Sequence, residues 1–329
     1  MGTNATKGMP DLQKADPVDS GVRKFVDALT EGYGAYPDLD TMPLHRRRAI
    51  AEQLRKSWRE AGPDMQRTRD FTAAGVKVRL HTPVDRTDLP VLVYIHGGGW
   101  MFFSNDTHDR LMREYAAGAE VAVLGIEYSL SPEAKFPTAL EEIDAVLAWL
   151  AEDGEALGLD SSRIAIGGDS AGANLAISTC IRRRDRGDTL PSAMVLNYGA
   201  FAPEHTDSYE RFGGPEFPLD IDEMDMFWEN YVSDPALLSN PLVAPLHAKL
   251  DNLPPAFLAI AQFDILTDCN VAMAQKLADA GVPVLARTYP GTTHSFLEAM
   301  SVAQPARQAI ADQAQWLRER LNAGGKRNS

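Results

Sequence analysis

Cysteine is nearly absent from this chain of 329 residues, which contains only Cys180 and Cys269. Two cysteines cannot build the disulfide framework of a small secreted protein, so we expect free thiols and a cytoplasmic location. Apolar runs are short as well: none approaches the ~18 residues that cross a membrane, and no apolar segment follows the polar start as in a signal peptide. These absences argue against a membrane as a partner.

Basic residues are also scarce, with 32 Lys and Arg against 46 Asp and Glu and a formal net charge of −14 at pH 7. A surface of this sign repels the phosphates of nucleic acids and of anionic lipids, so neither is expected as a partner. The hydrophobic share of 44% over this length is enough for one large buried core. We therefore expect a small-molecule substrate as the partner, while a homodimer is left open.

Short apolar runs alternate with helical patterns along most of the chain. The strand-like runs are 76–80, 91–95, 121–126, 164–167, 193–198, 256–261 and 284–288. The helical patterns are 22–29, 44–61, 110–117, 139–151, 173–183, 222–232, 271–280 and 306–321. Repeated alternation of this kind predicts an α/β fold with a mainly parallel central sheet flanked by helices on both faces.

One motif, Gly168-Asp169-Ser170-Ala171-Gly172, stands between a strand-like run and a helical pattern. A serine at such a corner is pushed away from the sheet, and small residues on either side leave room for the tight turn. This arrangement is typical of a nucleophile elbow. Taken alone, the motif has two other interpretations, a glycine-rich turn that only packs and a loop that holds a phosphate.

A second glycine cluster, His96-Gly97-Gly98-Gly99-Trp100, also follows a strand-like run. Three successive glycines expose backbone N–H groups with no side chain in the way. Acyl transfer builds negative charge on a carbonyl oxygen, and one positioned N–H donor stabilises that charge by about 3–4 kcal/mol. The two motifs therefore complement each other as a nucleophile and most of an oxyanion hole.

A serine nucleophile needs a base, normally a histidine oriented by a carboxylate. His294 and Asp264 each stand just beyond the end of a strand-like run, where open α/β sheets place their sites. Asp268 is instead interpreted as the N-cap of the helix that follows. The adjacent His108 and Asp109 point in different directions on a helix and match no metal motif, so neither a metal nor an organic cofactor is expected.

Together these residues resemble the hormone-sensitive-lipase-like branch of the α/β hydrolases, the GDSAG group of bacterial esterases, from about residue 70 to the C-terminal helix. The glycine cluster is similar to the H-G-G-G-[FW] box of that branch, and Tyr128-Ser129-Leu130-Ser131-Pro132-Glu133 to its Y-R-L-A-P-E segment. The order Ser170, Asp264, His294 is the order of its catalytic triad. The resemblance implies that Gly98, Gly99 and Ala171 donate the oxyanion N–H groups.

Three positions depart from the family pattern. Ser129 stands where arginine is common, Ser131 where alanine is usual, and Cys269 where glutamate is frequent. None of the three removes a reacting atom, so the departures concern substrate preference and local support.

Residues 201–240 interrupt the alternation and are rich in Pro, acidic and aromatic residues. The resemblance implies that they form a helical cap together with residues 1–65, above a catalytic domain of residues 66–329. The alternative is an ordinary helix whose aromatic residues serve the core. The residues expected to line the substrate pocket are all aromatic: Trp100, Phe102, Phe103, Phe212, Phe227, Trp228 and Tyr231.

The resulting hypothesis is a serine carboxylesterase that hydrolyses short- to medium-chain carboxylic esters through an acyl-enzyme. An amidase, formamidase or carbamate hydrolase with the same triad is an alternative that the sequence does not separate. An alternative of another class is a small-molecule receptor on this fold, as in relatives that have lost the base. Here Ser170, Asp264 and His294 are all present, which favours the enzyme.

Overall fold

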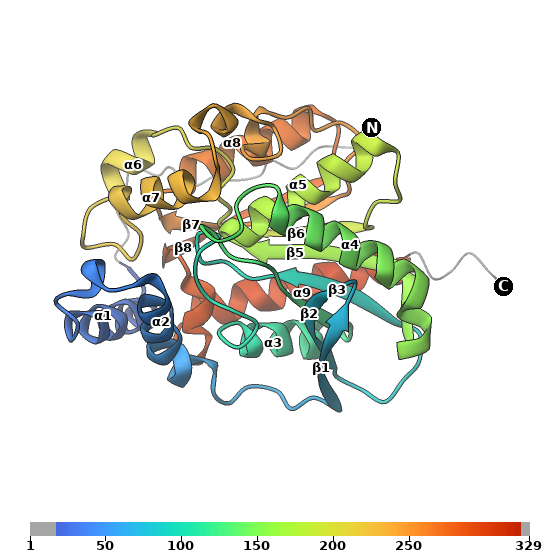
Figure 1. Cartoon of the computed structure of the whole chain (residues 1–329). Helices are drawn as coiled ribbons and strands as arrows, with labels where there is room; N and C mark the ends of the chain where they lie inside the picture. Colours follow the sequence, from blue (N-terminus) through green and yellow to red (C-terminus); the bar gives the residue numbers. More distant parts are fainter. Residues whose placement is uncertain (1–17, 324–329) are drawn as a thin grey trace.

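A single eight-stranded sheet forms the centre of the protein (Figure 1). The computed structural model describes residues 18–323. The strand order is β1-β2-β4-β3-β5-β6-β7-β8. The strands are β1 (Arg67–Ala73), β2 (Val76–Thr82), β3 (Leu89–Ile95), β4 (Ala122–Glu127), β5 (Leu159–Asp169), β6 (Ala193–Asn197), β7 (Ala256–Phe263) and β8 (Val284–Thr293).

The sheet is parallel from β4 through to β8, and only β2 pairs antiparallel with its two neighbours. Parallel strands bring their carboxyl ends to the same edge of a sheet, which is where open α/β sheets carry their sites. The ends of β3, β5, β7 and β8 therefore bring the glycine cluster, Ser170, Asp264 and His294 to one edge. This confirms the predicted α/β fold with a mainly parallel sheet.

Helices cover both faces of the sheet (Figure 1). The α-helices are α1 (Ser20–Gly34), α2 (Leu44–Arg59), α3 (Asp109–Ala119), α4 (Thr138–Asp153), α5 (Ala171–Arg186), α6 (Asp207–Phe212), α7 (Ile221–Tyr231), α8 (Thr267–Asp279) and α9 (Gln304–Ala323). The central strand β3 is buried at every position, with Val91, Val93 and Ile95 in the core under α4, α5 and α8. Leu92 and Tyr94 belong to the other core, with α1, α3 and α9. Alternate side chains of a strand point to opposite faces, so one apolar run serves two layers.

Among the strands and α-helices, two were not predicted from the sequence patterns, and both are marginal in composition or length. Strand β1, with the sequence RTRDFTA, lies at the edge of the sheet and is mostly exposed, so it carries charges where a buried strand carries apolar residues. Helix α6 has only six residues, too few for a helical period to show.

Helices α1 and α2 lie on the same side of the molecule as α6 and α7 (Figure 1). Arg48 of α2 holds this helix to the loop after β3, because its Nε donates to the carbonyl oxygen of Met101 at 2.7 Å and its guanidinium pairs with Glu133 at 2.7 Å. The division into a cap and a catalytic domain stays a prediction. None of the helices in the described part of the chain is long and apolar enough to cross a membrane.

Candidate active site

Ser170 occupies the sharp corner between β5 and α5. Its φ of 53° and ψ of −118° lie where L-residues are strained. The corner is held by a hydrogen bond from its backbone N–H to the carbonyl oxygen of Asn197 at 2.9 Å. A Cβ on Gly172 would collide with the carbonyl oxygen of Ile95, so α5 can approach β3 this closely only with glycine there. The serine hydroxyl is thereby presented at the edge of the sheet.

Ser170, His294 and Asp264 form a hydrogen-bonded chain across this edge. His294 Nε2 lies 3.0 Å from Ser170 Oγ, and His294 Nδ1 lies 2.8 Å from Asp264 Oδ2. The backbone N–H of Leu266 donates to the other oxygen of Asp264 at 2.9 Å. All three catalytic candidates are buried, with Ser170 and His294 each 7% exposed. This geometry allows the imidazole to take a proton from the serine while the carboxylate orients it.

The pKa of His294 is raised above its ordinary value by its surroundings. Burial disfavours the charged imidazolium, but the charge and the hydrogen bond of Asp264 outweigh burial. The more distant carboxylates of Asp169 and Glu223 act in the same direction. The ring of Tyr198 packs edge-on against the imidazole with the ring centroids 5.1 Å apart. The base is therefore both oriented and electrostatically prepared for a positive charge.

The glycine cluster after β3 supplies backbone N–H groups beside the serine. Gly98 has a φ of +106°, a conformation that favours glycine, and a Cβ there would collide with the carbonyl oxygen of Phe102. The N–H groups of Gly98, Gly99 and Ala171 donate to no other residue in the described part of the chain. Gly98, Gly99, Ser170 and His294 border the same cavity. Three amide donors are thus free to bind an oxyanion.

Asp169 supports the loop of the glycine cluster, a role that was not predicted from the sequence. Its Oδ1 accepts hydrogen bonds from Tyr94 at 2.9 Å and from the backbone N–H of Gly97 at 3.2 Å, and its Oδ2 lies 3.3 Å from His108 Nε2. Burial would raise the pKa of Asp169, but His108 and Tyr94 lower it. The pKa of His108 is raised in turn, because Asp169 outweighs its burial. A buried ion pair therefore ties the nucleophile elbow to the glycine cluster.

His96 does not act as a second base in this arrangement. Its Nδ1 lies 2.8 Å from the carbonyl oxygen of Gly97, and its ring stacks on Tyr128 with the centroids 4.4 Å apart. Burial, together with the positive charge of His108, lowers the pKa of His96 to about 3. A neutral imidazole locked between these groups shapes the loop and does not exchange protons at neutral pH.

A cavity of about 580 Å³ opens over Ser170 and His294. Of the seven aromatic residues expected in the pocket, Phe102, Phe103 and Phe227 line it. Trp100, Phe212, Trp228 and Tyr231 do not. Trp100 stacks on Tyr231 with the centroids 4.3 Å apart and packs on Trp228 at 4.6 Å, while Phe212 packs against Phe217 and Phe263. Trp100, Trp228 and Tyr231 therefore belong to the hydrophobic core. Phe212 lies behind the cavity lining, because its partner Phe217 borders the cavity.

The other walls of the cavity were not predicted from the sequence. Helix α1 contributes an apolar wall with Phe25, Val26 and Leu29. Charged residues also face the cavity, notably Arg47, Arg55 and Glu223, in addition to three aspartates. The amphipathic pattern of α1 signals that one side of this helix is buried but does not say against what.

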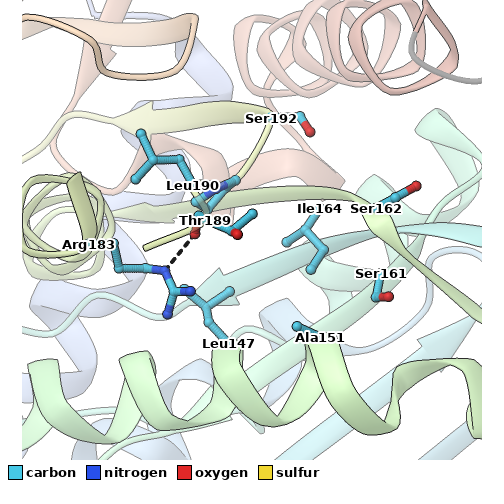
Figure 2. A pocket seen from close by; sticks show the side chains of 10 residues that line it. Leu147, Ala151, Ser161, Ser162, Ile164, Arg183, Thr189, Leu190 and Ser192 are labelled. Atoms are coloured by element: carbon cyan, nitrogen blue, oxygen red, sulfur yellow. Dashed lines mark hydrogen bonds between the residues drawn. The ribbon is translucent and has the colours of Figure 1, made fainter. Parts of the chain in front are cut away.

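A second cavity, of about 80 Å³, lies away from the triad, next to Ile164 in the middle of β5 and Ser192 just before β6 (Figure 2). The guanidinium of Arg183 reaches it but is already bonded, with Nε donating to the carbonyl oxygen of Thr189 at 2.8 Å and Nη1 to Asp144 at 2.6 Å. Neither a histidine nor a carboxylate lines this cavity. The hydroxyl of Ser162 donates to Asp160, which Arg163 already binds, and no histidine lines the cavity to act as a base. The cavity therefore lacks the groups of a serine hydrolase site.

Asp268 is not the N-cap of α8, which corrects the sequence-based interpretation. It lies in the first turn of that helix, and its carboxylate accepts a hydrogen bond from the backbone N–H of Ser208 at 2.8 Å. The hydroxyl of Ser208 accepts in return from the backbone N–H of Asp268 at 3.0 Å. This reciprocal pair of hydrogen bonds joins α8 to α6.

Within residues 18–323, no cluster of three or more metal-ligating side chains occurs.

The chain was compared with known families and solved structures. A family model described as alpha/beta hydrolase fold matches residues 92–298, well over half of the chain. The chain belongs to the α/β-hydrolase family. A hyperthermophilic esterase from the archaeon Pyrobaculum calidifontis has a TM-score of 0.86 at 32% identity, covering 92% of this chain and 99% of that one.

Two further α/β-hydrolase structures are similar over most of their length. A thermostable esterase from Pseudomonas putida ECU1011 has a TM-score of 0.85 at 29% identity and covers 94% of this chain and 99% of its own. The carboxylesterase EstE1 from a metagenomic library has a TM-score of 0.83 at 31% identity, with 85% and 98% covered. The resemblance to the hormone-sensitive-lipase-like branch is confirmed.

Proposed function

We propose that this α/β hydrolase is a serine carboxylesterase that acts on short- to medium-chain carboxylic esters. The observation that carries the proposal is the position of His294, hydrogen-bonded at the same time to Ser170 and Asp264 at the floor of the large cavity. The esterases among its structural relatives support the same reaction class.

The reaction follows from the geometry of these groups. Ser170 Oγ attacks the ester carbonyl while His294 Nε2 takes its proton, and Asp264 stabilises the imidazolium that forms. The carbonyl oxygen, now negative, accepts hydrogen bonds from the N–H groups of Gly98, Gly99 and Ala171. The C–O bond to the alcohol then breaks, and His294 delivers its proton to the leaving oxygen. Water repeats the sequence on the acyl-enzyme and releases the acid.

The preference for short and medium chains rests on the walls of the cavity. Phe102, Phe103 and Phe227 narrow it next to the glycine cluster, and each methylene that fits gains about 0.8 kcal/mol of burial. Turnover of p-nitrophenyl esters should rise from acetate to about butyrate or hexanoate and fall beyond octanoate, as the chain outgrows the space between these rings. A flat profile through palmitate would contradict this preference.

The experiment that tests the reaction class combines labelling and hydrolysis. A fluorophosphonate should modify Ser170, identified on the peptide by mass spectrometry, and should abolish hydrolysis of p-nitrophenyl butyrate. The matched p-nitroanilide of butyrate should be hydrolysed far more slowly; faster turnover of the anilide would favour the amidase alternative. Failure to label or to hydrolyse either compound would favour the receptor alternative.

We further propose that the protein acts in the cytoplasm on a small-molecule substrate. Cys180 and Cys269 are both buried free thiols, and burial raises the pKa of each to about 12, which keeps them protonated and unreactive. Neither supplies a disulfide for stability outside the cell.

A further inference from the structure

The cavity above Ser170 has an acidic wall as well as an apolar one. Four carboxylates border it against two guanidiniums: Asp40, Asp220, Asp222 and Glu223 against Arg47 and Arg55. The apolar wall suits the acyl chain of a neutral ester. The excess of carboxylates has no part in the hydrolysis derived above.

Both guanidiniums are already engaged, Arg55 by a carboxylate outside the cavity lining and Arg47 by one of the four that border it. Arg55 is buried and pairs with Glu298 at 2.9 Å, and it donates to the hydroxyl of Tyr33 at 2.9 Å. Arg47 lies 3.7 Å from Asp40. The charge of Arg55 is therefore neutralised by a residue that does not itself line the cavity. The net charge of the side chains that border the cavity remains negative.

Glu223 is the carboxylate placed to meet a substrate. It lies half-buried in the first turn of α7, in the cavity that also holds Ser170 and His294. Its carboxyl group makes no hydrogen bond or ion pair to any residue in the described part of the chain, whereas Asp220 caps α7 by accepting the N–H of Glu223 at 2.8 Å. The carboxyl group of Glu223 is therefore free to pair with a cationic group in the cavity without giving up a protein partner.

The titration of Glu223 places its charge change near neutral pH. Burial raises its pKa to about 7, and the neighbouring charge of Asp220 adds to this, while Arg55, His294 and Arg47 act in the opposite direction. The remaining charged groups of the cavity are Asp40 and Asp222. Glu223 is thus neutral in acid and negative at alkaline pH.

We propose that Glu223 makes the enzyme selective for esters that carry a cationic nitrogen, an inference that rests on the proposed esterase function. The ammonium group of such a substrate would occupy the acidic wall while the ester reaches Ser170 and the acyl chain contacts the aromatic side chains. An anionic substrate would instead face the surplus of carboxylates. The preference for cationic esters over neutral ones is strongest when Glu223 is ionised. It weakens as the carboxyl group takes up a proton.

A matched pair of esters tests this directly. Butyrylcholine and 3,3-dimethylbutyl butyrate have nearly the same shape and differ in a permanent positive charge, so any pH dependence of their kcat/KM ratio belongs to the enzyme. At pH 8.5 the ratio should favour butyrylcholine by about tenfold, as expected for a charge pair that solvent partly screens. Below pH 6, at constant ionic strength, the ratio should fall several-fold, because Glu223 is then protonated while the aspartates of the cavity keep their charge.

Variants assign the effect to one residue. Glu223→Gln should lower the ratio at pH 8.5 several-fold, to about its wild-type value below pH 6, and should remove its pH dependence. It should also shift the acid limb of kcat/KM for the neutral ester to lower pH, because Glu223 helps to raise the pKa of His294. Glu229→Gln, on the same helix but exposed and outside the cavity, should leave the ratio and the limb unchanged.

The outcomes separate the inference from the function on which it rests. A wild-type ratio near one at pH 8.5, or a tenfold ratio that survives Glu223→Gln, overturns the assignment of Glu223 while the esterase function stands. Absence of hydrolysis of the neutral ester, under conditions where the protein is folded, overturns the esterase function itself.

Discussion

The backbone of Ser170 is strained in order to present its hydroxyl, and the strain is independent of the hydroxyl itself. We expect Ser170→Ala to fold with a nearly unchanged melting temperature, since alanine meets the same backbone angles. Its kcat should fall by on the order of 10⁴–10⁶, as is usual for loss of a nucleophile that acts as one unit with its base. Steady-state hydrolysis of p-nitrophenyl butyrate measures this, and a loss smaller than tenfold would contradict the acyl-enzyme mechanism.

The two neighbouring aspartates of the 264–268 segment should respond very differently to the same change. Asp264→Asn removes the charge that orients His294, and we expect kcat to fall by roughly 10⁴. Asp268→Asn weakens only the reciprocal bonds with Ser208, so we expect kcat within a few-fold of wild type and a loss of stability of about 1 kcal/mol. Reversed effects in kinetics and urea unfolding would refute the assignment.

The catalytic candidates could be identified in the sequence because each lies in a short local motif. Ser170 and the glycine cluster each need particular small residues within two positions, which leaves a pattern that can be read directly. Asp169 was passed over although it lies in the same motif, because its partners Tyr94 and His108 come from distant segments. A buried ion pair of this kind has no local signature.

Helix α2 is joined to the catalytic loops by one buried ion pair. Arg55 pairs with Glu298 and lies over the ring of Phe103 at 4.0 Å from its centroid, so it contacts the loops of both the base and the oxyanion donors. We expect Arg55→Met to lower the free energy of unfolding by about 3–5 kcal/mol, because it leaves Glu298 buried and unpaired. The double variant Arg55→Met, Glu298→Gln should lose clearly less than the sum of the single variants in urea unfolding. Additive losses would show that the two groups do not depend on each other.

Helix α7 separates two adjacent aromatic residues into different environments. Phe227 lines the cavity, while Trp228 packs on Trp100 in the core. Phe227→Ala should enlarge the cavity and move the best acyl chain toward octanoate or beyond. Trp228→Ala should leave the chain-length profile unchanged and lower the free energy of unfolding by about 3–5 kcal/mol. The same p-nitrophenyl ester series and a urea titration measure both effects, and a changed profile in Trp228→Ala would contradict this division.

The sequence could not make that division between Phe227 and Trp228. Consecutive residues of a helix point about 100° apart, and α7 has apolar neighbours on more than one side. Both residues are aromatic, so hydrophobicity marks them as buried without saying which one faces open space. The facing direction depends on how α7 packs on Trp100 and Tyr231, which are far away along the chain.

The sequence predicts more of the sheet than of the cavity above it. Seven of its strands are apolar runs, because a parallel strand covered on both faces needs such a run, and alternation with helices indicates the parallel class. The strand order and the antiparallel pairing of β2 come from long-range contacts and were not predicted. The position of α1 and α2 beside α7, which creates the cavity, depends on the same long-range packing.

Activity and stability should respond to pH in opposite directions across the neutral range. His108, His294 and Glu223 have pKa values raised by folding, so their contributions to stability are complete below their unfolded values and are lost as pH rises through the folded ones. Asp169 and Asp109 have lowered pKa values, so their contributions are present above the unfolded value and are lost only in acid. Stability should therefore be greatest near about pH 4, and it should fall as pH rises, first with Glu223 and above about pH 6.5 also with the two histidines.

The base needs the opposite condition, because only neutral His294 accepts the proton of Ser170. From pH 6 to pH 9 we expect kcat/KM for p-nitrophenyl butyrate to rise through the raised pKa of His294, while the melting temperature falls by about 2–4 °C. Thermal unfolding and initial rates in the same buffers measure the two trends. In His108→Gln the fall in melting temperature should be shallower, since one of the titrating groups is gone. A melting temperature that rises together with activity would show that the buried His108–Asp169 pair does not carry the charge assigned to it here.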